Sequence, residues 1–263
     1  MSDIEFELNG GKPVFDPVKN AQKAMRAVLP KRFYKVAEAS EIETGFAVQL
    51  DGRTAKTSGR KPLVMPTHSL AKMVADEFAA QQEFIDPFSM PVLRIVNPAI
   101  DSVSDLMGEV RADIANYAGT DLLCYRANEP EKLIARQNAI WNPVIARVER
   151  EIGARFILAE GVMHVAQLPS TLSAFANRLE SETQDAFTLS STHVLTSLSG
   201  SAMLALSVKA DWLSASDAWL AAHVDEDWTI EFWGEDLEAK ARRAKRRIEF
   251  EAAAHVIAAM KTS

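Results

Sequence analysis

Hydrophobic and polar positions alternate near the start of the chain, which predicts a short β-sheet. Phe46, Val48 and Leu50 recur at period two, so one face of a strand over 45–50 is expected to be buried. The run Arg32–Val36 is rich in aromatic and branched residues and predicts another strand.

Residues typical of turns indicate how these predicted strands are connected. Asp51-Gly52 tolerates the positive φ angles of a two-residue hairpin, so Arg53–Lys56 should return antiparallel to the preceding strand. A third extended segment, Leu63–Met65, lies between two prolines. Together these segments predict a small antiparallel sheet.

A helical pattern follows Thr67 and is expected to cover this sheet. Its apolar positions return every three or four residues, at Leu70, Met73, Val74 and Phe78. One helix on an antiparallel sheet gives a small two-layer α/β domain, which we place at residues 1–90. The first 30 residues, with several glycines and prolines, predict an irregular leader with one helix over Val18–Val28 that packs on the body.

Helical periodicity dominates the rest of the chain, which predicts an all-α helical C-terminal domain over residues 91–263 and an α+β fold class. Only Phe156–Leu158 resembles a strand there. Candidate helix starts are Ser104, Asn142 with Pro143 in the first turn, Ser170, and a capping box at Ser214–Asp217 that opens a helix toward Trp228.

Two further helices have unusual composition. Small residues interleave with leucines over Ser190–Val208, which predicts one central helix with Gly200 inside it, where a neighbouring helix crosses closely. The last helix should turn Arg242, Arg243 and Arg246 outward. The apolar positions that it is expected to bury are Leu237, Ala241, Ala244, Ile248, Ala252 and Val256.

Composition narrows the class of protein. With 263 residues, 48% of them hydrophobic, the chain can fill a sizeable core. A net charge of −7 argues against sequence-independent binding to nucleic acid, which needs clustered bases. The single cysteine, Cys124, excludes an intrachain disulfide framework and fits a reducing compartment.

The expected location follows from the apolar runs and the first residues. No run of about 18 apolar residues exists, so we expect no membrane insertion. The acidic start lacks the charge pattern of secretory and transit signals. A bacterial cytoplasmic protein is the simplest interpretation, and a mitochondrial matrix protein that has lost its presequence is the other.

Candidate catalytic chemistry is sparse. The five histidines show no helical metal-ligand spacing, and there is no phosphate loop, dinucleotide fingerprint or nucleophile elbow. We therefore assign no catalytic residue, no metal site and no cofactor. The alternative is an enzyme that acts on a small anionic substrate at the domain junction through Tyr117, Asp121, Tyr125 and Arg126; in the structural interpretation of this segment, Thr120 caps a short helix.

The least ordinary stretch is Asp225–Arg247. Two tryptophans and a phenylalanine lie within a block of seven acids, and six bases follow at once. Acids near the start of a helix suit its dipole, so part of this order is structural. Gly234 is expected to break the stretch into two helices, which leaves a backbone break between two charged faces, as suits a rim that contacts another macromolecule.

Large aromatic side chains anchor cores and also dominate interfaces. From the residues alone we expect Trp219 and Trp233 in the core, and we leave Trp228 open between core and interface.

An ordered series of short motifs resembles the assembly chaperone that serves the alpha subunit of the ATP synthase catalytic head. The resemblance covers the chain from about Arg32 to the C-terminus. Its motifs are Arg32–Lys35, Leu50–Arg53 with Lys56-Thr57, Asp76–Phe78 with Gln81, Met90-Pro91, Tyr117–Arg126, Gln137, Trp141–Pro143, Trp228 and Trp233–Glu238.

This resemblance implies a function without catalysis. Such proteins bind the newly made alpha subunit and keep its apolar, beta-facing surface from aggregating until beta replaces the chaperone. We expect a monomer. One departure is Phe78, where the family has tryptophan: the aromatic anchor remains and the indole donor is absent.

The resemblance also implies a partner-binding site on the Asp225–Arg247 stretch. Glu238 is its first functional acid and Asp236 its second. We expect Trp228, Phe232 and the neighbouring small-residue helix surface to provide apolar contact, with Trp233 also among the partner-binding residues. Glu231, Asp236 and Glu238 are expected to pair with basic groups on the client. A generic binding module with no preference for alpha is a third interpretation.

Overall fold

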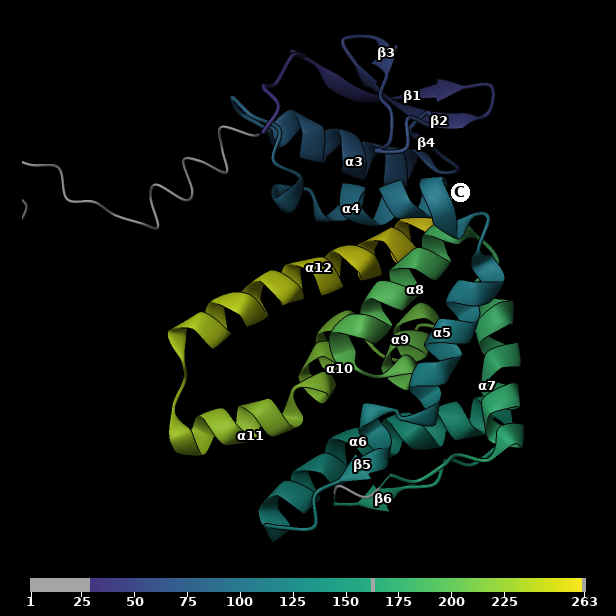
Figure 1. The fold of residues 1–263 in the computed structure, drawn as a ribbon, viewed down its shortest axis with the longest axis vertical. Coiled ribbons are helices and arrows are strands. Elements are labelled where there is room, and N and C mark those ends of the chain that lie inside the picture. Colours follow the sequence, from purple (N-terminus) through teal and green to yellow (C-terminus); the bar gives the residue numbers. More distant parts are fainter. Residues whose placement is uncertain (1–28, 162–163, 262–263) are drawn as a thin grey trace, which may run out of the picture.

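The computed structural model describes residues 29–161 and 164–261. A small antiparallel sheet lies at one end of the molecule, one helix covers it, and a larger group of helices lies beneath (Figure 1). This confirms the α+β fold class. The predicted leader and its helix over Val18–Val28 lie outside the described residues.

The sheet is organised around β2 (Gly45–Leu50), which pairs antiparallel with three short strands. These are β1 (Ala37–Ile42), β3 (Arg53–Thr54) and β4 (Val64–Met65). The hairpin at Asp51-Gly52 is confirmed: both residues have positive φ, and Leu50 pairs with Arg53.

The prediction of a strand over Arg32–Val36 is wrong, because the first strand begins at Ala37. The residues before it are held by side chains instead. Arg32 donates to the carbonyl oxygens of Tyr34 and Lys35, both at 3.0 Å, and the Asp51 carboxylate accepts the amide of Val36 at 2.9 Å. Aromatic composition was therefore a poor guide to strand position here.

Helix α3 (His68–Ala80) covers the sheet and confirms the predicted stripe, with Leu70, Val74 and Phe78 buried. Thr67 caps its first turn by accepting the Leu70 amide. Glu77 joins α3 to the next helix: its carboxylate accepts the amides of Val92 at 2.7 Å and Leu93 at 2.8 Å.

The chain then enters the helical part. A short turn of 3-10 helix, η1 (Pro87–Ser89), leads into α4 (Pro91–Pro98), a π-helical turn, η2 (Ala99–Val103), and α5 (Met107–Gly119). The predicted cap at Ser104 is wrong, because the π-turn carries the chain past that residue. Leu106, the residue directly before α5, is exposed.

Helix α6 (Glu131–Ile152) is continuous through Pro143, so the predicted helix start at Asn142 is wrong. Trp141, Val144 and Val148 are buried along one face on both sides of the proline, and this packing outweighs the loss of one helical hydrogen bond. The Trp141 indole N–H donates to the Ala221 carbonyl at 2.8 Å.

Two-residue strands β5 (Tyr125–Arg126) and β6 (Ala159–Glu160) pair in parallel beside α6, and η3 (Leu122–Cys124) precedes β5. The strand expected at Phe156–Leu158 is therefore misplaced, because β6 begins at Ala159. Helix α7 (Pro169–Glu182) starts one residue before the predicted Ser170, and it buries Phe175 and Leu179.

The predicted central helix is two helices, α8 (Ala186–Ser199) and α9 (Ala202–Lys209). Gly200 ends the first in a left-handed conformation, with φ 69°, and Ser201 caps the second. The prediction that Gly200 sits inside one helix is wrong: the glycine is needed for its positive φ.

Helix α10 (Ala215–Ala222) opens at the predicted capping box, with the Ser214 hydroxyl accepting the Asp217 amide, but it ends well before Trp228. His223 separates it from α11 (Val224–Trp233), and the last helix, α12 (Leu237–Lys261), completes the fold.

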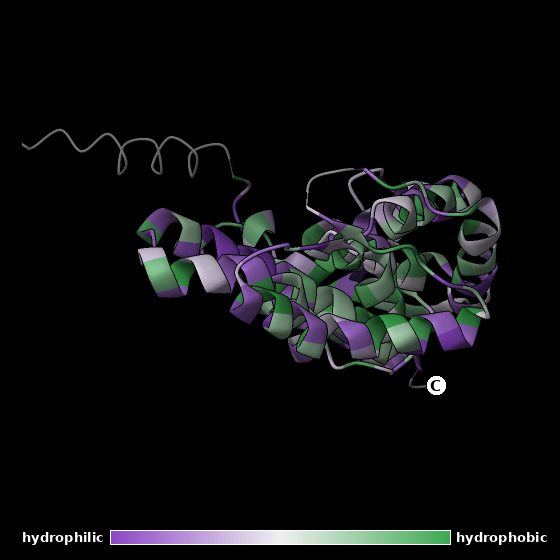
Figure 2. Cartoon of the chain, turned by 90° about the horizontal axis from the view of Figure 1, so that it is seen from below, coloured by the Kyte–Doolittle hydropathy of each residue, from purple (hydrophilic) through white to green (hydrophobic). Residues whose placement is uncertain are grey.

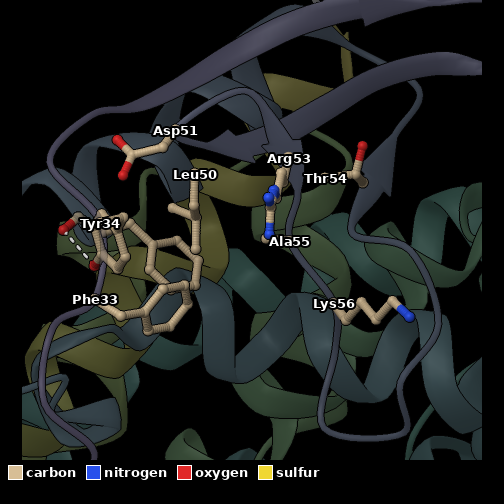
Figure 3. Close-up of a pocket in the computed structure, with 9 residues that line it drawn as sticks. Phe33, Tyr34, Leu50, Asp51, Arg53, Thr54, Ala55 and Lys56 are labelled. Carbon is tan, nitrogen blue, oxygen red and sulfur yellow. Dashed lines mark hydrogen bonds between the residues drawn. The ribbon is translucent and has the colours of Figure 1, made fainter.

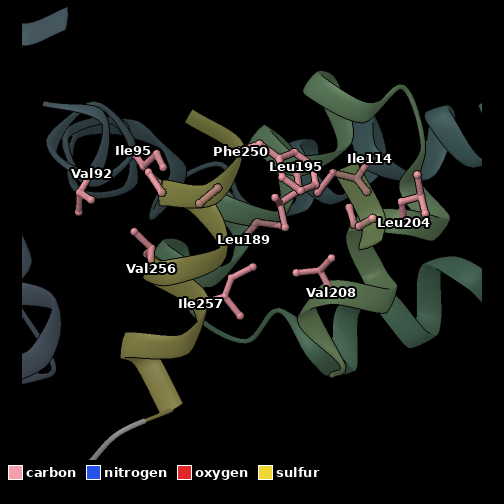
Figure 4. Close-up of a cluster of buried hydrophobic side chains, with 14 of the residues drawn as sticks. Val92, Ile95, Ile114, Leu189, Leu195, Leu204, Val208, Phe250, Val256 and Ile257 are labelled. Atoms are coloured by element: carbon pink, nitrogen blue, oxygen red, sulfur yellow. The ribbon is translucent and has the colours of Figure 1, made fainter. Parts of the chain in front are cut away.

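One hydrophobic core joins the two parts. Figure 4 shows buried side chains of α4, α5, α8, α9 and α12 converging, among them Ile95, Leu189, Phe250 and Val256. The Thr67 hydroxyl, at the start of α3, donates to the Ala259 carbonyl of α12 at 3.0 Å. A domain boundary at residue 90 stays a prediction, and the core runs across it. Within the described residues, no helix has the length and apolar composition needed to cross a membrane.

The partly buried Glu77 should make stability depend on pH. Burial raises the pKa of Glu77 to about 7, against backbone hydrogen bonds that lower it. Between about pH 4.5 and 7 the folded state then binds more protons than the unfolded state. The free energy of unfolding should therefore fall by roughly 2–3 kcal/mol as the pH rises from about 4.5 to 7. Denaturant titrations at several pH values measure this.

Glu77→Gln should flatten that dependence, because the amide does not titrate. Asp76→Asn, at the exposed neighbouring carboxylate, is the matched control and should keep the parent slope. An equally steep fall in Glu77→Gln would show that other groups cause it.

Candidate functional site

Residues 224–248 form a projecting helical hairpin, which we call the arm. It consists of α11, a turn at residues 234–236 and the first half of α12, and it extends away from the rest of the helices (Figure 1). Gly234 ends α11 with φ 85°, which confirms the predicted break. Asp236 caps α12 by accepting the Glu238 amide at 3.1 Å.

The arm presents large apolar side chains to solvent. Trp233 is 87% exposed and Leu237 79%, and Phe232 and Ile248 are also mostly exposed. Figure 2 shows the arm from below, at the left, with hydrophobic and hydrophilic residues interspersed on it. Single exposed apolar residues are ordinary, but a group of them on one projecting element indicates a binding surface.

The expectation that Trp233 lies in the core is wrong, because its side chain is exposed. Trp219 is buried as predicted. Leu237, Ala241, Ala244 and Ile248 were likewise expected to be buried, and they are exposed. The reason is geometric. Helix α12 meets the core only from Phe250 onward, and its earlier turns project beyond it.

An ion pair holds the two helices of the arm together. The Arg243 guanidinium lies 2.5 Å from the Asp227 carboxylate and 3.9 Å from that of Glu226. The prediction that Arg243 turns outward is wrong, since its side chain is only 20% exposed. Arg246 donates to the Leu198 carbonyl at 2.7 Å and ties α12 to the end of α8.

Helix α6 supports the other side of the arm. Arg136 donates to both carboxylate oxygens of Glu231, at 2.7 and 2.8 Å, and these hydrogen bonds lower the pKa of Glu231. The same guanidinium lies 5.0 Å from the centroid of the Trp228 ring. The Gln137 amide donates to Asp225 at 2.7 Å.

All six predicted partner-binding residues lie on the arm, but their surroundings and their exposure to solvent differ. Trp228 is partly buried beneath Arg136, and the exposed Phe232 lies against it with ring centroids 4.6 Å apart. Both oxygens of Glu231 are engaged by Arg136. Trp233 and Glu238 are the most open, with the Glu238 side chain 86% exposed and 3.5 Å from Arg242.

Three residues that belong to this site were not predicted for it. Leu237 and Ile248 had been assigned to a buried stripe, and the sequence carries no signal for where α12 leaves the core. Arg136 lies 95 residues from its partner Glu231, so only the tertiary structure reveals the pair.

Of the residues in the alternative enzyme interpretation, Asp121 and Arg126 are buried, whereas Tyr117 and Tyr125 are partly exposed. Asp121 is fully buried and caps η3, accepting the amides of Leu123 and Met203, both at 3.0 Å. Arg126 is buried and donates to Leu123, Asn138 and Asn142. These partners come from η3, α6 and α9 rather than from the sheet. The predicted cap at Thr120 is wrong, because Asp121 takes that role.

Burial raises the pKa of Asp121 to about 6. A perturbed carboxylate alone does not mark a catalytic site, since structural networks also perturb pKa values. Among residues 29–161 and 164–261, no three His, Cys, Asp or Glu side chains gather as a metal ion would require.

The arm therefore defines the class of protein. An exposed aromatic tip, bordered by acids and held in place by ion pairs to its own scaffold, is suited to contact with another macromolecule rather than to chemistry on a small substrate.

Comparisons with known proteins identify the family. A family model described as ATP12 chaperone protein matches residues 31–149. The crystal structure of a putative chaperone from Agrobacterium tumefaciens is 46% identical, with a TM-score of 0.85, over 93% of this chain and 91% of that chain. Atp12 from Paracoccus denitrificans is 36% identical, with a TM-score of 0.81, over 88% of this chain and 98% of that chain.

The chain belongs to the ATP12 chaperone family. It is accordingly a chaperone of ATP synthase assembly.

Arg136 should position the arm. Arg136→Ala removes the bidentate pair with Glu231 and the contact with Trp228, so we expect faster amide hydrogen exchange across residues 224–236. Global stability should change little, because exposed ion pairs contribute little. Exchange measured by mass spectrometry tests this.

Arg242→Ala is the matched control, since its 3.5 Å contact with Glu238 lies within α12. If both variants exchange like the parent protein across the arm, Arg136 does not hold the arm in place.

Proposed function

We propose that this chain binds the unassembled alpha subunit of the ATP synthase catalytic head and covers the surface that beta later occupies. The arm makes the central contact. Membership of the ATP12 chaperone family supports this proposal, as does the description of the Agrobacterium relative as a putative chaperone.

The proposal rests mainly on the exposed tip of the arm. Trp233, Leu237 and Phe232 form an apolar surface that has no cover within the described residues. Burial of apolar area on a partner releases about 25 cal/mol per Å². Tryptophan is also among the residues that most often dominate binding energy. An apolar tip of this kind matches a client whose own interface is apolar and unassembled.

The acids around the tip orient the client. Glu238 projects from the first turn of α12, where its carboxylate is open to a basic group on a partner. Asp236, which caps α12, lies beside it. Glu231 takes a different role in this proposal, because Arg136 already engages both of its oxygens. It fixes the arm, and Glu238 and Asp236 contact the client.

An assembly chaperone must also release its client. Stable interfaces bury about 1,200–2,000 Å² in total. A dissociation constant near micromolar corresponds to roughly −8 kcal/mol, which protects the client and still permits exchange. A single projecting arm with a few aromatic anchors fits that intermediate affinity.

We further propose that the chain acts as a monomer in the bacterial cytoplasm, where the alpha subunit is made. The bacterial origin of the related structures supports this location.

Glu238→Lys should weaken protection of the alpha subunit and leave the fold intact, because this side chain is almost fully exposed. Light scattering of refolding alpha subunit with increasing chaperone measures protection, and we expect at least a several-fold higher concentration to be needed. Glu43→Lys, in the exposed turn between β1 and β2, is the matched charge reversal and should protect normally. Normal protection by Glu238→Lys would contradict the charge assignment.

Trp233→Ala should lower affinity for the alpha subunit by more than tenfold, since truncation of a central aromatic anchor costs about 2 kcal/mol or more. Titration calorimetry measures this. Phe88→Ala is the control, because Phe88 is an exposed aromatic on η1, outside the arm. An equal loss in both variants would show that the effect is not specific to the arm.

The function itself is tested by recovery of the alpha subunit on tagged chaperone from lysate, followed by addition of excess beta. Alpha should be recovered and then released by beta. Absence of alpha from the recovered material would overturn the proposal.

A further inference from the structure

A groove of about 630 Å³ lies beside the sheet, between the β2–β3 hairpin and the segment that leads into β1 (Figure 3). Its floor is apolar and includes the buried side chains of Leu50, Ala55 and Phe78. Phe33 stands at one side and is 76% exposed. The groove thus combines a hydrophobic floor with an aromatic ring that is exposed to solvent.

Two cations line the same groove. Arg53 and Lys56 are both exposed, and neither side chain has a hydrogen bond or ion pair with any residue of the described chain. Asp51 does not neutralise them directly: its carboxylate accepts the amides of Lys35 and Val36, and these hydrogen bonds lower its pKa. The groove therefore suits an extended segment that is both apolar and acidic.

We propose that Ile4–Leu8 of this same chain docks in the groove. In an extended conformation Ile4, Phe6 and Leu8 point to one side, and Glu5 and Glu7 to the other. The apolar side faces the floor, and the acids pair with Arg53 and Lys56. The first eight residues carry three acids and no Lys or Arg, so their charge is opposite to that of the groove.

The covalent connection favours this occupant over a separate molecule. The described chain begins at Leu29, only four residues before Phe33. Residues 9–28 link the segment to that point, and with the predicted helix over Val18–Val28 and the other nine residues extended they span up to about 46 Å. A tethered segment faces its site at an effective concentration in the millimolar range, so a weak contact is enough to occupy it.

The contact would cover Phe33 and the apolar floor in the free protein. It is independent of the proposed contact between the arm and the alpha subunit, since the groove lies beside the sheet and the arm is formed by α11 and α12. The test therefore needs only the purified full chain, and its failure would leave the proposed function unaffected.

Photocross-linking tests the docking directly. Photoreactive benzoylphenylalanine replaces Phe6 in the full chain, and peptides are mapped by mass spectrometry after irradiation at low protein concentration. We expect intramolecular cross-links to Phe33 and to residues 53–56. The same amino acid in place of Phe15 is the control for position, and should give at least several-fold less cross-linking to the groove.

The charge pairing is tested in the same experiment. The double variant Arg53→Glu and Lys56→Glu should reduce groove cross-links from position 6 several-fold, as should high salt. Lys245→Glu, an exposed charge reversal on α12, should not. Cross-links mainly to other surfaces, cross-links only between molecules, or groove cross-links that appear only when alpha subunit is added would each overturn the proposal.

Discussion

The packing of the second half of α12 determines where the proposed binding surface lies. Phe250, Ala253, Val256 and Ile257 are buried between the sheet layer and the other helices. Because α12 is one continuous helix, the direction of this buried half also fixes the direction of its exposed half. The packing of the core therefore fixes the direction of the arm. Only a few further contacts are needed to hold α11, the other helix of the arm.

Those further contacts are polar and come from distant parts of the chain. Arg243 joins α12 to α11, and Arg136 and Gln137 join α11 to α6. Hydrophobic burial would have hidden the aromatic side chains that contact the client in the proposed function. Ion pairs and hydrogen bonds position α11 while Phe232 and Trp233 stay open to solvent.

Most of the motifs that carry the family resemblance have structural roles. Glu77 caps α4, Gln81 accepts the Asp86 amide, Gln137 joins Ala127, the residue after β5, to the arm, and Trp141 anchors α6 to α10. Phe78 lies against Tyr34 with ring centroids 5.8 Å apart. The Trp233–Glu238 motif differs from these, because its aromatic and acidic side chains face solvent.

The sequence was a good guide to local structure and a poor guide to long-range geometry. The Asp51-Gly52 hairpin, the cap at Thr67 and the break at Gly234 follow from short-range chemistry, and all three are confirmed. Continuity through Pro143 depends on packing that no local signal records, whereas the break at Gly200 follows from local chemistry, a left-handed glycine before a capping serine, that was interpreted as a helix crossing. The exposure of Trp233 depends on where α12 leaves the core, and the pairing of Arg136 with Glu231 on how α6 packs beside α11, so the sequence suggests a candidate site on this stretch without its geometry.

The most direct test is hydrogen exchange of the purified chain with and without unassembled alpha subunit. The account predicts that binding protects amides within residues 228–248 and that excess beta removes this protection. Unchanged exchange in the arm, with protection confined to other helices, would contradict the claim that the arm is the client-binding surface.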